Sequence, residues 1–269
     1  MTFYSNDSKP QLTFSEINMI CEKWVKKLQL EDLSIYFNYI EEPFNKEMGR
    51  PAFLQWIHED QEWEICFYQL VDKKTVIHEL GHIYLAKILN NWHFVSSWES
   101  PKEWSKKINI EIDKFLNRLL DCFVDYNLSK FDDFYSAYIS HIDSGLDKYP
   151  DPGAYKMNKF LFYYLKAYID FYFILKPKDN SKFISRIREN LKKVRNTIII
   201  KSKQENRKLH FKRFQNLDKQ LDEFNLIKNS LDPKTIINFF YKTLKILGFW
   251  NSKELQYNIK LYFGINIIE

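Results

Sequence analysis

Cysteine is scarce in this sequence, which holds three among 269 residues. Cys21, Cys66 and Cys122 lie far apart and form no CxxC pair. A disulfide framework or a zinc site built from thiolates needs more cysteines at closer spacing, so the sequence argues against both. We expect three buried free thiols, as is usual in the reducing environment of the cytoplasm.

Long apolar runs without charge are also lacking. The N-terminal stretch MTFYSNDSKPQLTF is polar, without the basic start and apolar run of a signal peptide. The most apolar segment, residues 159–176, carries Lys166 and Asp170 in its interior and owes its apolar character largely to Tyr and Phe. Such charges disfavour a membrane-spanning helix. The sequence therefore predicts a cytoplasmic protein with no membrane anchor and an aromatic core helix at this segment.

The composition that is present suits a globular protein. Hydrophobic residues make up 45% of the chain and aromatic residues 17%, enough to bury a sizeable core. Apolar spacing predicts an amphipathic helix over residues 14–29, with Ser15 available as its cap. A polar turn around Asp60 and Gln61 separates two of the three segments that we expect to be short strands. These segments are 33–42, 51–60 and 62–70.

The next predicted helix contains the sequence VIHELGHIYLA. Asp72 is suited to cap it, and the helix is expected to run over residues 73–89. Apolar side chains cover most of its circumference, so the helix should be buried beyond its first turn. A buried helix must supply partners for His78, Glu79 and His82, because unpaired polar groups are costly in a core.

The two histidines have the spacing of a metal-binding pair. His78 and His82 are four residues apart, so both imidazoles lie on one helical face and can bind a single Zn²⁺ ion. Glu79 is placed to take a proton from a water that zinc activates, which is the arrangement of a peptidase. The alternative is that both histidines are core residues hydrogen-bonded to backbone or carboxylate groups.

A third ligand must come from elsewhere in the chain. The continuation HExxHxxGxxH would need Gly and His where the sequence has Leu85 and Ile88, so the metzincin arrangement is excluded. The following helix is expected to open at Ser100 and continue to about Leu128. Acidic residues in and before this helix are the remaining candidates: Glu99, Glu103, Glu111, Asp113, Asp121 and Asp125.

One polar stripe on that helix favours two of the candidates. Asn117, Asp121 and Asp125 repeat every four residues among apolar neighbours, and a buried carboxylate needs a compensating charge. We therefore predict Asp121 as the third zinc ligand. Asp125, one turn later, is predicted to accept a hydrogen bond from the N–H of a ligand histidine. The alternative is that both aspartates lie on a stripe that faces water.

With these residues the sequence resembles the gluzincin class of zinc metallopeptidases. HELGH at residues 78–82 and DCFVD at residues 121–125 resemble the HExxH and ExxxD motifs of that class, with Asp in place of the usual Glu. The element order is also similar to the compact minigluzincin and ImmA/IrrE-like layouts. The resemblance implies that the strand at 62–70, just before the motif helix, is the sheet edge along which a protein or peptide substrate lies extended. It also makes His141, in the turn-rich segment 141–153 after the ligand helix, a candidate for stabilising the oxyanion, although a surface histidine is the alternative.

The predicted fold class is α+β. Residues 1–130 would form a zincin-like core of helix, small three-stranded sheet, HExxH helix and ligand helix, and residues 131–269 a mainly helical region. Residues 176–220 contain fifteen Lys or Arg against four Asp or Glu. This segment is either a solvated basic face or a surface for nucleic acid or an acidic partner. A non-catalytic, zinc-stabilised binding protein is therefore the alternative to a metallopeptidase.

Overall fold

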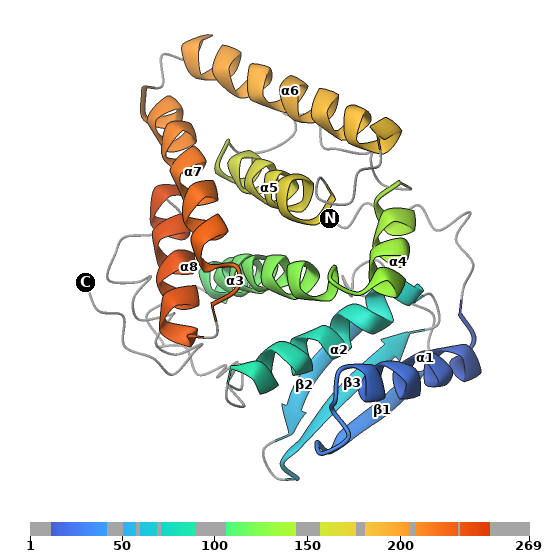
Figure 1. The fold of residues 1–269 in the computed structure, drawn as a ribbon. Helices are drawn as coiled ribbons and strands as arrows, with labels where there is room; N and C mark the ends of the chain where they lie inside the picture. Colours follow the sequence, from blue (N-terminus) through green and yellow to red (C-terminus); the bar gives the residue numbers. More distant parts are fainter. Residues whose placement is uncertain are drawn as a thin grey trace. The chain divides into compact units, whose positions relative to one another are not determined.

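The protein has an α+β fold, as the sequence predicts (Figure 1). Two compact units are present, the first drawn from residues 1–94 and 127–148 and the second from residues 95–126 and 149–269. The predicted division near residue 130 stays a prediction. The computed structural model describes residues 12–41, 51–57, 60–68, 71–89, 106–143, 157–175, 181–204, 208–230 and 232–247.

Helix α1 (Phe14–Lys27) opens the first unit, and its cap is Thr13 rather than the predicted Ser15. The backbone N–H of Glu16 donates to Thr13 Oγ1 at 3.3 Å, and the Thr13 N–H donates to the Glu16 carboxylate at 2.7 Å. This reciprocal capping box satisfies two backbone donors, which a Ser in the first turn of the helix does not do. The spacing Thr-x-x-Glu in the sequence was the pattern that could have predicted this cap.

Three strands form a mixed sheet in the order β1-β3-β2. Strand β3 (Glu62–Tyr68) pairs in parallel with β1 (Ile35–Ile40) and antiparallel with β2 (Ala52–Ile57). The turn between β2 and β3 includes Gln61, whose φ of 54° is in the left-handed region. The hairpin is confirmed. The expectation that the strand before the motif helix is a sheet edge is wrong, because β1 pairs along its second side.

Helices α1 and α2 (Lys73–Ile88) cover one face of this sheet (Figure 1). Alternate β3 residues point to that face because side chains in a strand alternate between its two sides. The buried set includes Ile17, Cys21 and Trp24 of α1, Trp63, Ile65 and Phe67 of β3, and Val76, Ile77 and Leu80 of α2. This core holds the motif helix in a fixed place relative to the sheet.

Helix α4 (Asp132–Asp143) also packs against α2 in the first unit. Asp133 of α4 accepts a hydrogen bond from Lys23 at 2.8 Å, and Phe131 packs edge-on against Trp24 of α1. The structure places His141 in the last turn of α4 and not in the irregular segment that the sequence predicted.

The second unit is helical. Helix α3 runs from Lys106 to Leu128, and α5 (Met157–Ile169) continues into the π-helical segment η3 (Asp170–Leu175). The other helices are α6 (Ser181–Gln204), α7 (Lys208–Ile227) and α8 (Pro233–Leu247). The predicted end of α3 at Leu128 is confirmed, whereas its predicted start at Ser100 lies outside the described residues.

An aromatic cluster forms the core of this second unit. The ring of Phe123 on α3 lies 4.9 Å from that of Phe224 on α7 and 6.0 Å from that of Phe239 on α8. The edge-on geometry of these pairs is favourable for aromatic rings. Within the described residues, no helix has both the length and the apolarity needed to cross a membrane, and the predicted core helix is seen as α5 with η3.

Candidate metal centre

Helix α2 carries the histidine motif, and its start is set by Asp72. Asp72 Oδ1 accepts hydrogen bonds from the N–H and the hydroxyl of Thr75, both at 2.8 Å. This cap satisfies a backbone donor that the first turn leaves unpaired, as the sequence predicts. Two turns on, the His78 side chain is buried and His82 is half-buried.

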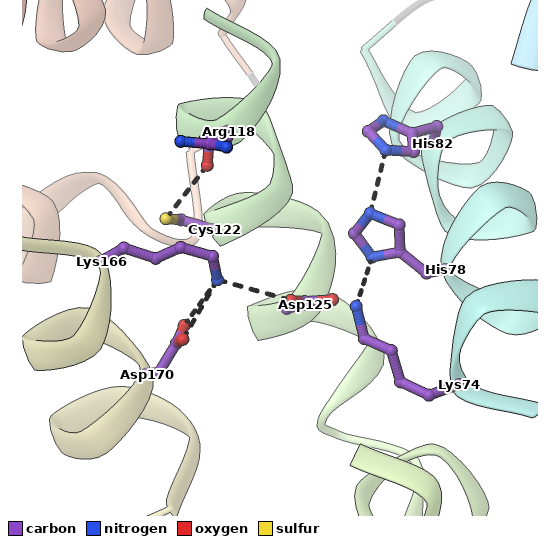
Figure 2. A network of polar contacts seen from close by, with 8 residues as sticks. All are labelled: Lys74, His78, His82, Arg118, Cys122, Asp125, Lys166 and Asp170. Carbon is purple, nitrogen blue, oxygen red and sulfur yellow. Dashed lines mark hydrogen bonds and ion pairs between the residues drawn. The ribbon is translucent and has the colours of Figure 1, made fainter. Parts of the chain in front are cut away.

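The two imidazoles converge on one point. Their Nε2 atoms lie 3.2 Å apart and their ring planes are perpendicular (Figure 2). A tetrahedral zinc ion with Zn–N bonds of about 2.0 to 2.1 Å holds its two nitrogen ligands about 3.3 Å apart. The observed separation therefore fits two ligands of one small metal ion. It also permits a hydrogen bond between the two rings.

The His78 ring has an ammonium group on its other side. Lys74 Nζ lies 3.3 Å from His78 Nδ1 (Figure 2). An ammonium can only donate, so Nδ1 is the acceptor in this contact. A histidine that binds metal through Nε2 usually donates its Nδ1–H instead. Metal binding at Nε2 of His78 therefore requires Lys74 to leave this position.

Asp121 lies on α3, in the second unit, and its role as the third ligand stays a prediction. Two imidazoles and a carboxylate are a donor set that zinc accepts, with a fourth position left for water or substrate.

Asp125 lies one turn after Asp121, and only 2% of its surface is exposed. Its Oδ2 atom lies 3.9 Å from Lys166 Nζ of α5. The buried position agrees with the expectation that this carboxylate needs compensation, and Lys166 supplies a positive charge. The predicted hydrogen bond from a ligand histidine to Asp125 stays a prediction.

His141 has a specific partner in the first unit. Its Nδ1 atom lies 2.8 Å from Asp72 Oδ2, the oxygen that does not cap α2. Burial works against the charged carboxylate, but the contact with His141 and the hydrogen bonds from Thr75 outweigh it and hold the pKa of Asp72 far below its usual range. The role of His141 in catalysis stays a prediction, and so does that of Glu79, which is half-buried on α2.

Sequence reasoning missed Lys74, Lys166 and the contact between Asp72 and His141. Lys74 and His78 are four residues apart on one helix, and so are Lys166 and Asp170, so these two pairs were readable from their spacing. The partners Asp72 and His141 are separated by 69 residues and join two elements, which no local pattern reports.

Comparison with known proteins does not identify this chain. No family model matches the sequence, and neither a curated protein nor a solved structure is significantly similar to it.

Proposed function

We propose that this protein is a zinc-dependent metallopeptidase of the gluzincin type. The observation that carries the proposal is the convergence of the His78 and His82 Nε2 atoms at 3.2 Å on a helix that also bears Glu79. His78, His82 and Asp121 would hold the ion. Zinc bound there supplies Lewis acidity and makes water a nucleophile near neutral pH.

The chain's own side chains would carry the proton transfers. Glu79 follows His78 directly on α2, and its carboxylate takes a proton from the attacking water as general base. His141 donates a hydrogen bond to the oxygen of the peptide carbonyl as negative charge develops there. Asp72 orients the His141 ring through its contact at 2.8 Å with Nδ1, and the proposed role is that Nε2 of that ring faces the substrate.

The outer side of β2 offers an edge for an extended substrate. Strand β2 is antiparallel to β3 and lies at an edge of the described sheet. The Tyr68 N–H donates to the Pro51 carbonyl at 2.9 Å, which fixes the alternation of the β2–β3 ladder. The N–H groups of Leu54 and Trp56 consequently point away from β3. A peptide added alongside β2 would bond to these two residues.

Metal analysis and turnover together test the proposal. Wild-type protein should carry about one zinc per chain, and His82→Ala should lose it. Glu79→Gln should retain zinc and melting temperature but lose cleavage of an unfolded protein substrate, since Glu79 is assigned to water and not to metal. Glu22→Gln, an exposed glutamate on α1, is the matched control and should behave as wild type. Equal zinc in wild type and His82→Ala would remove the basis of the proposal.

A second function is favoured by the exposed basic face of α6. Arg188, Lys192 and Arg195 are exposed and spaced four and three residues apart, so they share one helical face. Such a row fits the phosphates of a nucleic acid. Under this alternative, zinc would stabilise a binding protein. Salt-sensitive binding of a DNA or RNA duplex would then occur without any hydrolysis that depends on Glu79.

A further inference from the structure

In the second unit, charged side chains of α5 and η3 lie beside α3, the helix that carries Asp121 and Asp125. Lys166 Nζ of α5 lies 3.1 and 3.4 Å from the two carboxylate oxygens of Asp170 and 3.9 Å from Asp125 Oδ2 (Figure 2). Cys122, on the same stretch of α3, is 1% exposed, and its thiol donates to the Arg118 carbonyl at 3.4 Å. The peptidase chemistry proposed above assigns no role to Lys166 or Asp170.

The ammonium of Lys166 is a permanent charge at this position. Burial disfavours it, but the carboxylates of Asp170 and Asp125 outweigh burial and hold the pKa of Lys166 well above its ordinary value. Lys166 thus lies beside Asp125, and Asp121, the candidate metal ligand, stands one turn earlier on the same helix. Two positive charges can therefore compensate the α3 carboxylates. One is the ammonium of Lys166, and the other would be a bound metal ion.

Asp170 holds Lys166 in place at an unusual turn. It is the first residue of the π-helical segment η3, and it lies four residues after Lys166. A π-helical turn is rare and is found often at functional sites. The bidentate contact draws Lys166 to one position beside α3, and both side chains are largely shielded from water, with 27% and 13% exposure.

We propose that Lys166 is a positioning residue that balances the α3 carboxylates in the metal-free protein and thereby limits the metal affinity of the group containing Asp121. The inference rests on the proposed metal binding. Without Lys166, the metal-free protein would keep Asp125 buried with less compensation, which is strongly destabilising. A divalent cation bound to Asp121, in contrast, would no longer be repelled by the ammonium of Lys166. Loss of the charge therefore has opposite effects on the metal-free fold and on metal affinity.

Substitutions that change charge in opposite directions test this inference. Lys166→Met should lower the melting temperature of the metal-free protein and tighten zinc binding on the order of tenfold. Asp170→Asn is nearly isosteric and leaves Lys166 with one carboxylate fewer, so it should weaken zinc binding. Lys166→Arg keeps the charge and should bind zinc within about twofold of wild type. Affinity is measured for the full chain by competition with a chromophoric chelator, and the melting temperature after removal of metal.

An exposed lysine on α6 supplies the control, because Lys192→Met should leave both quantities unchanged. Unchanged or weaker zinc binding by folded Lys166→Met overturns the inference. If that variant does not fold, unchanged or tighter zinc binding by Asp170→Asn overturns it equally. A wild-type protein that binds no zinc refutes the proposed function itself, whereas zinc binding that is the same in wild type and both charge variants refutes the inference alone.

Discussion

The two carboxylate oxygens of Asp72 contact different partners. One oxygen caps α2 through Thr75, and the other lies 2.8 Å from His141 on α4. The motif helix is therefore joined at its N-cap to the helix that carries the predicted oxyanion donor. A single side chain couples the position of His78, two turns later, to the position of His141.

The lowered pKa of Asp72 predicts how stability depends on pH. Its folded pKa lies below the ordinary value of 3.8, so the unfolded state binds more protons between the two values. The stabilisation by this carboxylate is therefore fully present above about pH 4 and decreases as the pH falls toward the folded pKa. Asp72→Asn should lower the free energy of unfolding at pH 7 by about 1 to 2 kcal/mol, because the neutral amide can still cap α2 but loses the charged contact with His141.

Urea unfolding of wild type and Asp72→Asn over a series of pH values measures this effect. We expect the difference in unfolding free energy between the two proteins to narrow as the pH is lowered below about 4. A difference that stays constant across that range would show that Asp72 acts only through hydrogen bonds that its neutral form also makes.

At the level of elements, the position of β3 inside the sheet decides where a substrate can bind. Both sides of β3 are hydrogen-bonded, to β1 and to β2, so its backbone cannot accept a further strand. The hydrogen-bonding side of β2 that faces away from β3 is the place that the proposed function uses. The strand that leads into the motif helix is thus a support for the site and not its binding edge.

Leu54→Pro tests the binding role of β2. Proline removes the outward N–H of Leu54 and leaves the β2–β3 hydrogen bonds intact, as is tolerated in an edge strand. Peptide turnover should fall by about tenfold or more, because a hydrogen bond that contributes about 1 kcal/mol is lost and the edge is obstructed. Zinc content should stay at the wild-type level.

Leu54→Ala is the control for this prediction. It shortens the same side chain but keeps the N–H, so turnover should remain close to that of wild type. Equal losses in both variants would assign the effect to packing against β3, where Leu54 stands opposite Ile65. The binding edge would then have to be sought elsewhere.

Across the whole molecule, the three thiols are inaccessible in the folded state. Cys21, Cys66 and Cys122 are free, and at most 3% of each is exposed. Burial raises the pKa of the Cys21 and Cys66 thiols to about 12, and it also raises that of Cys122. Because the thiolate is the reactive form, all three should be inert near neutral pH.

Thiol labelling therefore reports unfolding of both units. In native buffer at pH 8, a disulfide reagent such as dithiobis(nitrobenzoate) should react with none of the three within minutes, whereas in concentrated urea it should react with all. Cys21 and Cys66 belong to the first unit and Cys122 to the second, so labelling followed by peptide mapping separates their unfolding. Rapid labelling of any thiol in native buffer would contradict the packing described above.

Local features of the site were determined by the sequence alone. The helix that bears His78 and His82 was predicted within one residue at its end, with Asp72 as its cap, because capping and the 3.6-residue period depend on neighbours in the chain. The same period brought the two imidazoles to one side of the helix. The three strands, the turn between two of them and the end of α3 at Leu128 were also predictable, because these patterns likewise depend on residues that are close together in the chain.

Only the tertiary structure decided which distant residues meet. The parallel pairing of β1 with β3, the contact of His141 with Asp72 and that of Lys166 with Asp125 each join elements that are separate in the chain. Spacing along a helix or strand carries no information about such pairs. They arise because the folded chain must bury apolar faces together, and the charges brought along with those faces then find their partners.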